Sequence, residues 1–154
     1  MFTGVAFITG ATSGIGQATA QSFARKGAKR IVLVDLGDLS VTVSLLRGVE
    51  TLSVQADVSD EAQVKAAMAA AVNKWGRVDY AAMAQLNNDA PGLVETPMTA
   101  GQVITEDSAP DVLPMARPGM PEELADVITF MCCEEAASYV NSVMWSVDGG
   151  PMVH

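Results

Sequence analysis

The feature that most constrains this chain is a short apolar run that leads directly into closely spaced glycines, Val5 to Gly16. The apolar run has the composition of a buried strand and ends at Thr9. Three glycines follow at spacings of four and two, and a helical pattern of apolar residues then continues to Lys26. The stretch therefore predicts a strand, a tight loop and a helix in direct succession.

Such a loop is suited to binding an anion, because without a Cβ the backbone N–H groups can approach the ligand closely. The helix that follows adds its unpaired N-terminal N–H groups and the positive end of its dipole. About 20 residues past the glycines, Asp35 closes a second apolar run, where a carboxylate can accept hydrogen bonds from an adenosine ribose. The motif predicts a dinucleotide site that includes Gly10, Thr12, Ser13, Gly14, Ile15, Gly16 and Asp35.

Strand and helix patterns alternate along the chain. Apolar runs predict strands at residues 31–34, 51–55, 78–83 and 143–147, and helical patterns cover residues 39–46, 59–75 and 121–133. We expect Ser59 to cap the helix that Gly76 ends, with an apolar stripe at Val64, Ala67, Met68, Ala71, Val72 and Trp75. This order predicts an α/β fold: a reduced Rossmann-type, doubly wound and mostly parallel sheet with helices on both faces.

The composition sets further bounds. A chain of 154 residues predicts a single domain spanning residues 1–154, and no apolar run approaches the length of a membrane span. We therefore expect a soluble, cytoplasmic protein with no membrane partner. The adjacent Cys132 and Cys133 are predicted to be buried thiols on one helix. His154 is the only histidine, so no metal site is expected.

Charge argues against nucleic acid as a partner. The formal net charge is −9, and residues 85–154 carry Arg117 alone against eleven acidic residues. Such a surface repels phosphate backbones. The excess of acid is interpreted as a solvated face, with a basic partner as the alternative.

The string from Thr9 to Gly16 resembles the cofactor signature of the short-chain dehydrogenase/reductase family. Further matches come in family order: Asp57-Val58, then Pro91-Gly92-Leu93-Val94-Glu95-Thr96-Pro97-Met98, then Ser146-Val147-Asp148-Gly149-Gly150. The resemblance implies a nicotinamide dinucleotide held by the glycines, by Asp57 and Val58, and by Val94 and Thr96 at the nicotinamide end. We predict NAD, because Asp35 would face the 2′-phosphate of NADP without a neighbouring cation.

The chain departs from the family in its centre, where a block of helices and a strand is missing. The family relies on a Tyr-x-x-x-Lys pair, yet Tyr80 is followed four residues on by Ala84 and Tyr139 by Val143. No catalytic residue is assigned for this reason. The resemblance implies an oxidoreductase on a small carbonyl or alcohol substrate. It would be active only if the segment 91–121 or a second subunit supplies the missing acid. Alternatives are a redox-inactive isomerase or cyclase, a non-catalytic binding or regulatory protein, and a shortened gene product.

Two expectations follow from the missing block. Residues 91–120 form a long connection rich in proline and methionine, which is predicted to be a lid or a disordered loop. A parallel sheet that has lost strands and helices leaves one side uncovered. We therefore predict a homodimer or larger assembly that covers it.

Overall fold

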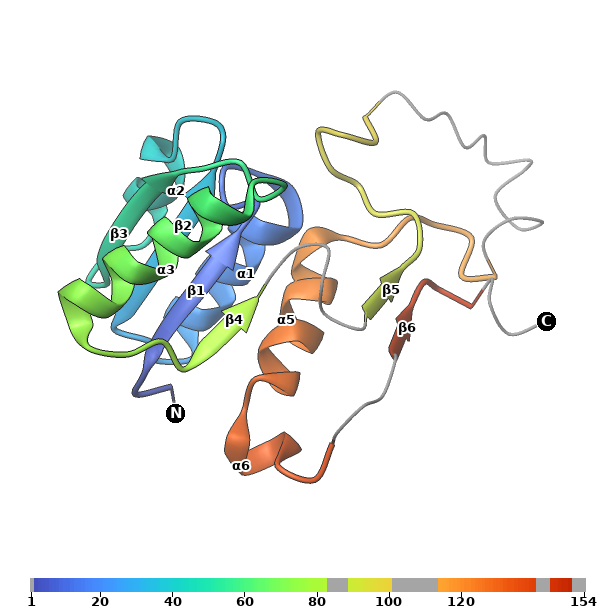
Figure 1. Ribbon diagram of the computed structural model, residues 1–154. Coiled ribbons are helices and arrows are strands. Elements are labelled where there is room, and N and C mark those ends of the chain that lie inside the picture. The colour runs from blue at the N-terminus through green and yellow to red at the C-terminus, as the bar shows by residue number, and fades with distance from the viewer. Residues whose placement is uncertain (1, 83–88, 101–113, 141–144, 151–154) are drawn as a thin grey trace.

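The computed structural model describes residues 2–82, 89–100, 114–140 and 145–150. Its elements (Figure 1) are, in chain order, β1 (Val5–Thr9), α1 (Gly14–Arg25), β2 (Arg30–Asp35), α2 (Ser40–Leu45), β3 (Glu50–Gln55), α3 (Glu61–Trp75), β4 (Tyr80–Ala82), β5 (Asp89–Pro91), α5 (Pro121–Met131), α6 (Glu134–Ala137) and β6 (Trp145–Val147). The strand, loop and helix predicted at the start of the chain are confirmed as β1, its loop and α1.

The first four strands form one parallel sheet in the order β3-β2-β1-β4. The register pairs Thr9 with Val34 and Asp35 with Gln55, so these strands end together at one edge of the sheet. In open α/β sheets, ligands bind outside this carboxyl edge. The loops that leave β1, β2 and β3 are therefore the first place to look for a site.

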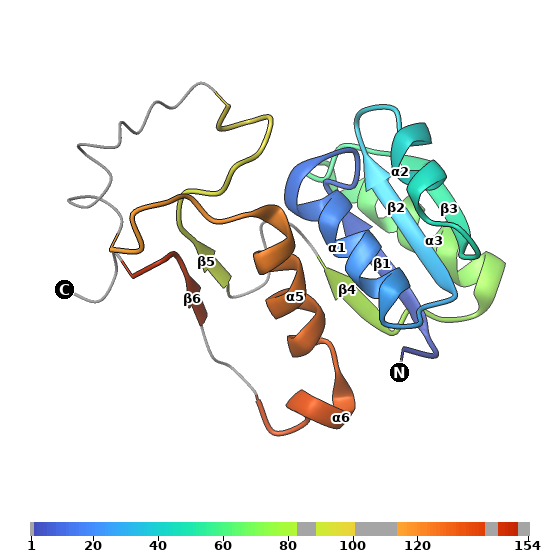
Figure 2. The same cartoon turned by 180° about the vertical axis from the view of Figure 1, so that it is seen from behind.

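Helices cover both faces of this sheet, as the sequence predicts. α3 lies on one face and α1 and α2 on the other, which the two opposite views show (Figures 1 and 2). Successive strand side chains point to opposite faces. In β1, Val5 and Phe7 join the apolar cluster under α3, whereas Ala6 and Ile8 join the cluster under α1, and all four are buried. Cover on both faces accounts for strands that are apolar throughout.

The predicted α/β fold with a mostly parallel sheet is confirmed, but its strands divide into two sheets. β5 and β6 form a separate parallel pair, and α5 lies between this pair and the four-stranded sheet (Figures 1 and 2). The reason is the connection between β4 and β5, which contains only residues 83–88. A strand that pairs in parallel with its predecessor needs a crossover of roughly a dozen residues or more. β5 therefore cannot extend the sheet beside β4.

Four details of the helices differ from expectation. Asp60, not Ser59, caps α3: its carboxylate accepts hydrogen bonds from the N–H groups of Ala62 at 2.9 Å and Gln63 at 3.3 Å. Of the predicted stripe on α3, only Ala67 and Ala71 are buried, and Val72 is exposed.

α5 begins at Pro121 as predicted, but it buries Leu124, Ala125, Ile128 and Thr129. The helical spacing also predicts that Val127 and Met131 are buried, but both are only half-buried. Thr129 is instead the residue that meets α1. Cys132 and Cys133 do not share a helix, since α5 ends at Met131 and α6 starts at Glu134. Cys132 and Cys133 form no disulfide, and both are half-buried rather than buried.

Candidate dinucleotide site

The glycine-rich loop, residues 10–16, joins β1 to α1 at the carboxyl edge of the sheet. A Cβ on Gly16 would lie 2.1 Å from the carbonyl oxygen of Gly10, so only glycine lets α1 start this close to the strand. Gly14 has a φ of +53°, and a Cβ there would also lie 3.1 Å from a methyl group of Thr96. The loop thus has no room for side chains at these two positions, which leaves its backbone accessible.

Asp35 ends β2 directly beside this loop. Its Oδ2 accepts hydrogen bonds from the N–H of Thr12 at 3.0 Å and from the Thr12 hydroxyl at 2.8 Å, and its Oδ1 accepts one from the N–H of Gly37 at 3.1 Å. Partial burial raises the pKa of Asp35, but these hydrogen bonds outweigh it and hold the pKa below its ordinary value. The structure therefore brings together the loop and an ionised carboxylate, as the spacing predicts.

The residues after β3 lie at the same edge. The N–H of Ala56 donates to the carbonyl of Asp35 at 3.0 Å, which sets the end of β3 next to the end of β2. Asp57 accepts hydrogen bonds from the hydroxyl and the N–H of Ser59, which lower its pKa. Val58 is 44% exposed. Both residues are thus near the predicted adenosine end, with Val58 available as an apolar contact.

Val94 and Thr96 reach the loop from the far half of the sequence. Val94 is buried and forms a parallel bridge with Gly119, whose N–H and carbonyl bond to Leu93 and Glu95 at 2.9 Å each. This bridge fixes the segment that ends at Thr96, whose methyl group contacts the Gly14 position. The structure therefore places Thr96 against the glycine-rich loop, 82 residues away in sequence from Gly14.

Ile15 has a structural role in this arrangement. It is half-buried and packs against the apolar cluster under α1, so its side chain points into the core. Only its backbone, in the first turn of α1, is positioned to meet an anion.

Two residues that hold the loop were missed from the sequence, Gln17 and Thr42. The Gln17 amide donates to the carbonyl of Thr12 at 3.0 Å and to the hydroxyl of Thr42 at 2.8 Å. Thr42 in turn donates to the carbonyl of Ala11 at 2.7 Å. No local motif marks these residues; the only signal was a single hydroxyl in the run Val41-Thr42-Val43.

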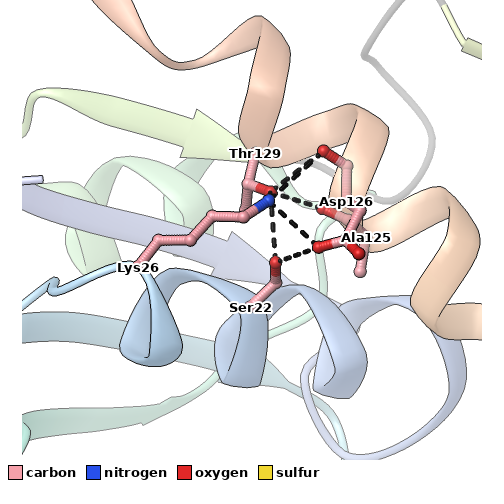
Figure 3. A network of polar contacts seen from close by, with 5 residues as sticks. All are labelled: Ser22, Lys26, Ala125, Asp126 and Thr129. Atoms are coloured by element: carbon pink, nitrogen blue, oxygen red, sulfur yellow. Dashed lines mark hydrogen bonds and ion pairs between the residues drawn. The ribbon is translucent and has the colours of Figure 1, made fainter. Parts of the chain in front are cut away.

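A polar network clamps α5 onto α1 (Figure 3). Asp126 on α5 accepts hydrogen bonds from Lys26, the residue that follows α1, at 3.0 Å and from the buried Ser22 of α1 at 2.8 Å. Lys26 also donates to Thr129, which donates to the carbonyl of Ala125 at 2.8 Å. The network fixes the helix that follows Gly119, and so the position of the Val94–Thr96 segment.

With this geometry established, comparison with known proteins identifies the family. Residues 4–84, more than half of the chain, match the sequence profile of the short chain dehydrogenases. The chain belongs to the short-chain dehydrogenase family. The matched region contains the glycine-rich loop, Asp35, Asp57 and Val58.

Two curated relatives illustrate the range of the family. Levodione reductase of Leifsonia aquatica is 43% identical over 81 residues, covering 49% of this chain and 30% of that protein. A (+)-cis,cis-nepetalactol synthase of Nepeta racemosa is 42% identical over 77 residues, covering 49% of this chain and 28% of that protein. The chain thus matches less than a third of the length of each relative.

A solved structure shows the fold shared with the short-chain dehydrogenases. L-sorbose reductase from Gluconobacter frateurii, complexed with NADPH and L-sorbose, aligns with a TM-score of 0.83 over 98% of this chain and 97% of that chain. The sequence identity is 21%, so the likeness concerns the fold.

The Tyr-x-x-x-Lys pair expected of a short-chain dehydrogenase has no counterpart among the two tyrosines. Tyr80 is half-buried with its ring edge on Phe2, at a centroid distance of 5.0 Å. Burial raises the pKa of its phenol, and the negative charge of Asp79 raises it further. The family mechanism needs a phenol whose pKa a lysine lowers. Tyr139 is fully exposed on the surface.

Three acids in or beside the predicted lid are candidates to replace the tyrosine, namely Asp89, Glu95 and Glu106. Glu95 is exposed next to Thr96. Glu106 lies outside the described residues, and so does the part of the predicted lid from Gly101 to Leu113. Within the described ranges, no group of three or more His, Cys, Asp or Glu could hold a metal ion. No helix in those ranges is long and apolar enough to pass through a bilayer.

A pocket of about 490 Å³ lies beside the Val94 segment. Its apolar lining includes Leu93, Met115 and Val147, and an ion pair of Arg117 with Glu123 at 2.8 Å lies in its wall. No residue of the glycine-rich loop and no part of Asp35 lines this pocket. It is therefore separate from the predicted dinucleotide site.

Proposed function

We propose that this chain binds NAD(H), with the pyrophosphate on the glycine-rich loop and the adenosine ribose on Asp35. The observation that carries the proposal is the position of Asp35, which ends β2 and is fixed to the loop through Thr12. Thr96, in contact with the Gly14 position, supports placing the nicotinamide end on the Val94 segment.

The same carboxylate supports NAD over NADP. Asp35 would face the 2′-phosphate of NADP, and neither Ser13 nor Leu36 supplies a cation to neutralise it. Two like charges about 4 Å apart cost roughly 1–4 kcal/mol, which is about tenfold to several-hundredfold in affinity. L-sorbose reductase was solved with NADPH, so cofactor choice has to be argued from the residues of this chain.

Calorimetry tests the binding proposal directly. We expect NAD and ADP-ribose to bind, NADP to bind at least about tenfold more weakly, and Asp35→Ala to narrow that gap. Asp38→Ala is the matched control, because Asp38 is an exposed carboxylate that bonds only to nearby Ser40. Tighter binding of NADP than of NAD by the unaltered chain would refute the cofactor assignment.

For chemistry, we propose an oxidoreductase acting on a small carbonyl or alcohol substrate, with the proton supplied by a group other than the family tyrosine. Family membership and the likeness to levodione reductase support the reaction class. The acid would come from the segment 91–121 or from a second subunit.

A redox-inactive role is the second candidate, and one specific observation favours it. A relative that is 42% identical over 77 residues is named a nepetalactol synthase. Such a descendant would keep the dinucleotide site and use the remaining pocket as an isomerase or cyclase. Incubation with NADH and a panel of carbonyl substrates separates the two, because only the oxidoreductase consumes NADH.

A further inference from the structure

We propose that Thr42, acting with Gln17, is a positioning residue that fixes the glycine-rich loop in its anion-binding conformation before a ligand arrives. The inference rests on the proposed dinucleotide site and deepens it. Thr42 lies on α2, a helix whose neighbouring Val41 and Val43 are exposed, yet Thr42 itself is fully buried. Its hydroxyl points at the loop, 31 residues earlier in the chain.

The partners of this hydroxyl are the reason for assigning it a role. Among the described residues, the other fully buried threonines donate their hydroxyl hydrogen within their own helix: Thr19 to the carbonyl of Ile15 and Thr129 to that of Ala125, although the Thr129 oxygen also accepts from Lys26. Such a local bond is the usual solution for a threonine inside a helix. Thr42 instead donates to Ala11, in a different element. A valine would fill the same space without the polar group, so the hydroxyl serves the contact with the loop.

The contact determines which way the backbone of the loop points. A trans peptide unit is planar, and its C=O and N–H point in opposite directions. The carbonyl of Ala11 is held by Thr42, so the N–H of Thr12 points the other way, where it donates to Asp35 at 3.0 Å. One hydrogen bond thus anchors each side of this peptide unit.

The next peptide unit is held in the same manner. The carbonyl of Thr12 accepts from the Gln17 amide, and that amide also donates to the Thr42 hydroxyl. Ser13 is the residue that caps α1, and its N–H therefore points away from Gln17. Backbone N–H groups at this place are the donors that an anion uses at a helix N-terminus. Gln17 and Thr42 together set their direction, which removes part of the ordering cost of binding.

The test compares Thr42→Val, which keeps the shape, with Thr42→Ser, which keeps the hydroxyl. Calorimetry with ADP-ribose is carried out well below the unfolding temperature of each variant. We expect Thr42→Val to weaken binding about fivefold to thirtyfold, the range of a lost buried hydrogen bond that leaves its partners unsatisfied. Thr42→Ser should stay within about threefold of the unaltered chain, and Thr19→Val serves as the control in which a local hydroxyl is lost.

A double-mutant cycle with Gln17→Met adds a readout that a loss of stability alone would not produce. Because both residues act through one shared hydrogen bond, their effects on ADP-ribose affinity should be less than additive. Faster amide exchange at Ser13 in Thr42→Val, with exchange in β1 unchanged, would show the loop loosened directly. If Thr42→Val fails to fold, the ADP-ribose affinity of Gln17→Met alone decides whether the positioning role holds. This variant is expected to fold because Gln17 is only half-buried.

The outcomes separate two failures. If the unaltered chain does not bind ADP-ribose, the proposed function is overturned, and the positioning role with it. If it binds while Thr42→Val binds equally well, only the positioning role is overturned. Strictly additive effects of the two substitutions would also overturn the shared role.

Discussion

A methyl group at position 16 would overlap with neighbouring backbone atoms. It would fall 2.1 Å from the carbonyl oxygen of Gly10 and 2.7 Å from that of Thr9, and both are backbone atoms that cannot swing aside. The close approach of α1 to β1 is also what presents the first turn of the helix to the loop. At the scale of single residues, stability and binding therefore depend on the same contact.

We predict that Gly16→Ala destabilises the protein by about 1–3 kcal/mol, the usual cost of overpacking, and weakens ADP-ribose binding by at least about tenfold. Gly119→Ala is the control, because a Cβ there meets its nearest atoms at ordinary distances of 3.7 and 3.8 Å. Denaturant unfolding and calorimetry measure the two effects. Equal behaviour of both alanine variants would contradict the argument.

Some residues of the site could be predicted from the sequence because their signals are local. The glycines and Asp35 follow from spacing alone, since the strand, the loop and the next strand are consecutive. Gln17 and Thr42 could not be found in this way, because their hydrogen bonds connect residues that only the folded chain brings together. The sequence predicts the cap of α3 one residue too early for a different reason. Ser59 and Asp60 are both good N-cap residues, but the Ser59 hydroxyl donates to Asp57 instead.

At the scale of elements, the α1–α5 clamp makes the second half of the chain depend on the first (Figure 3). Hydrogen bonds from Lys26 and Ser22 hold the pKa of Asp126 below its ordinary value of 3.8. A depressed pKa in the folded state means that this carboxylate stabilises the fold above the pKa of the unfolded chain. That contribution is lost as the pH falls through the lower, folded-state pKa.

We predict that Asp126→Asn lowers the free energy of unfolding by about 1 kcal/mol at neutral pH, because the pair is partly exposed and screened. The difference from the unaltered chain should shrink as the pH falls below 3.8 and through the lower folded-state pKa of Asp126, where the carboxyl becomes protonated in the folded chain as well. Denaturant unfolding across this pH range provides the measurement, with Glu122→Gln as an exposed control on the same helix. A difference that is the same at pH 7 and at acidic pH would rule out the ionic clamp.

The division of the sheet illustrates what the sequence left open at this scale. The strands of the first sheet and β6 were predictable from their sequence patterns, but β5 was not, because Asp89-Ala90-Pro91 is not an apolar run. Its pairing with β6 depends on which neighbours the chain can reach. The short connection after β4 excludes β5 from the first sheet, and β6 then pairs with β5 beyond α5.

On the scale of the whole molecule, one edge of the four-stranded sheet is open among the described residues, because β4 pairs with β1 alone. Ala81, in the middle of β4, is exposed on this edge strand. Unpaired strand edges favour association with another chain.

We predict a homodimer or larger assembly, with the β4 edge, α5 or β6 at the interface. Light scattering over a range of concentrations measures the mass. Ala81→Arg should shift the balance toward monomer if the β4 edge is the interface, and Ala62→Arg on the exposed start of α3 should not. A monomer mass that does not change with concentration would contradict the prediction.

The lack of an identified acid gives the last prediction. Reduction of a carbonyl needs a proton donor close to the forming alkoxide, and general acid catalysis contributes about 10²–10⁴-fold. Glu95, next to Thr96, is exposed to solvent. Unless the segment 91–121 or a second subunit supplies a protonated acid, we expect no appreciable NADH oxidation with ordinary ketones or aldehydes, even where NADH binds. Turnover at an ordinary enzymatic rate that Asp35→Ala abolishes would show that such an acid is in place and would refute the redox-inactive candidate.

The separation of the two sheets also implies an order in time. Every pairing of the four-stranded sheet lies within residues 5–82, whereas β5 and β6 join Asp89 to Trp145. During synthesis the first sheet can form while the later residues are still being added, and the second pairing must wait until a long loop closes. Thr96 can settle against Gly14 only after α5 has docked. The glycine-rich loop is therefore built early, and the segment that contacts it is the last part of the candidate site to be assembled.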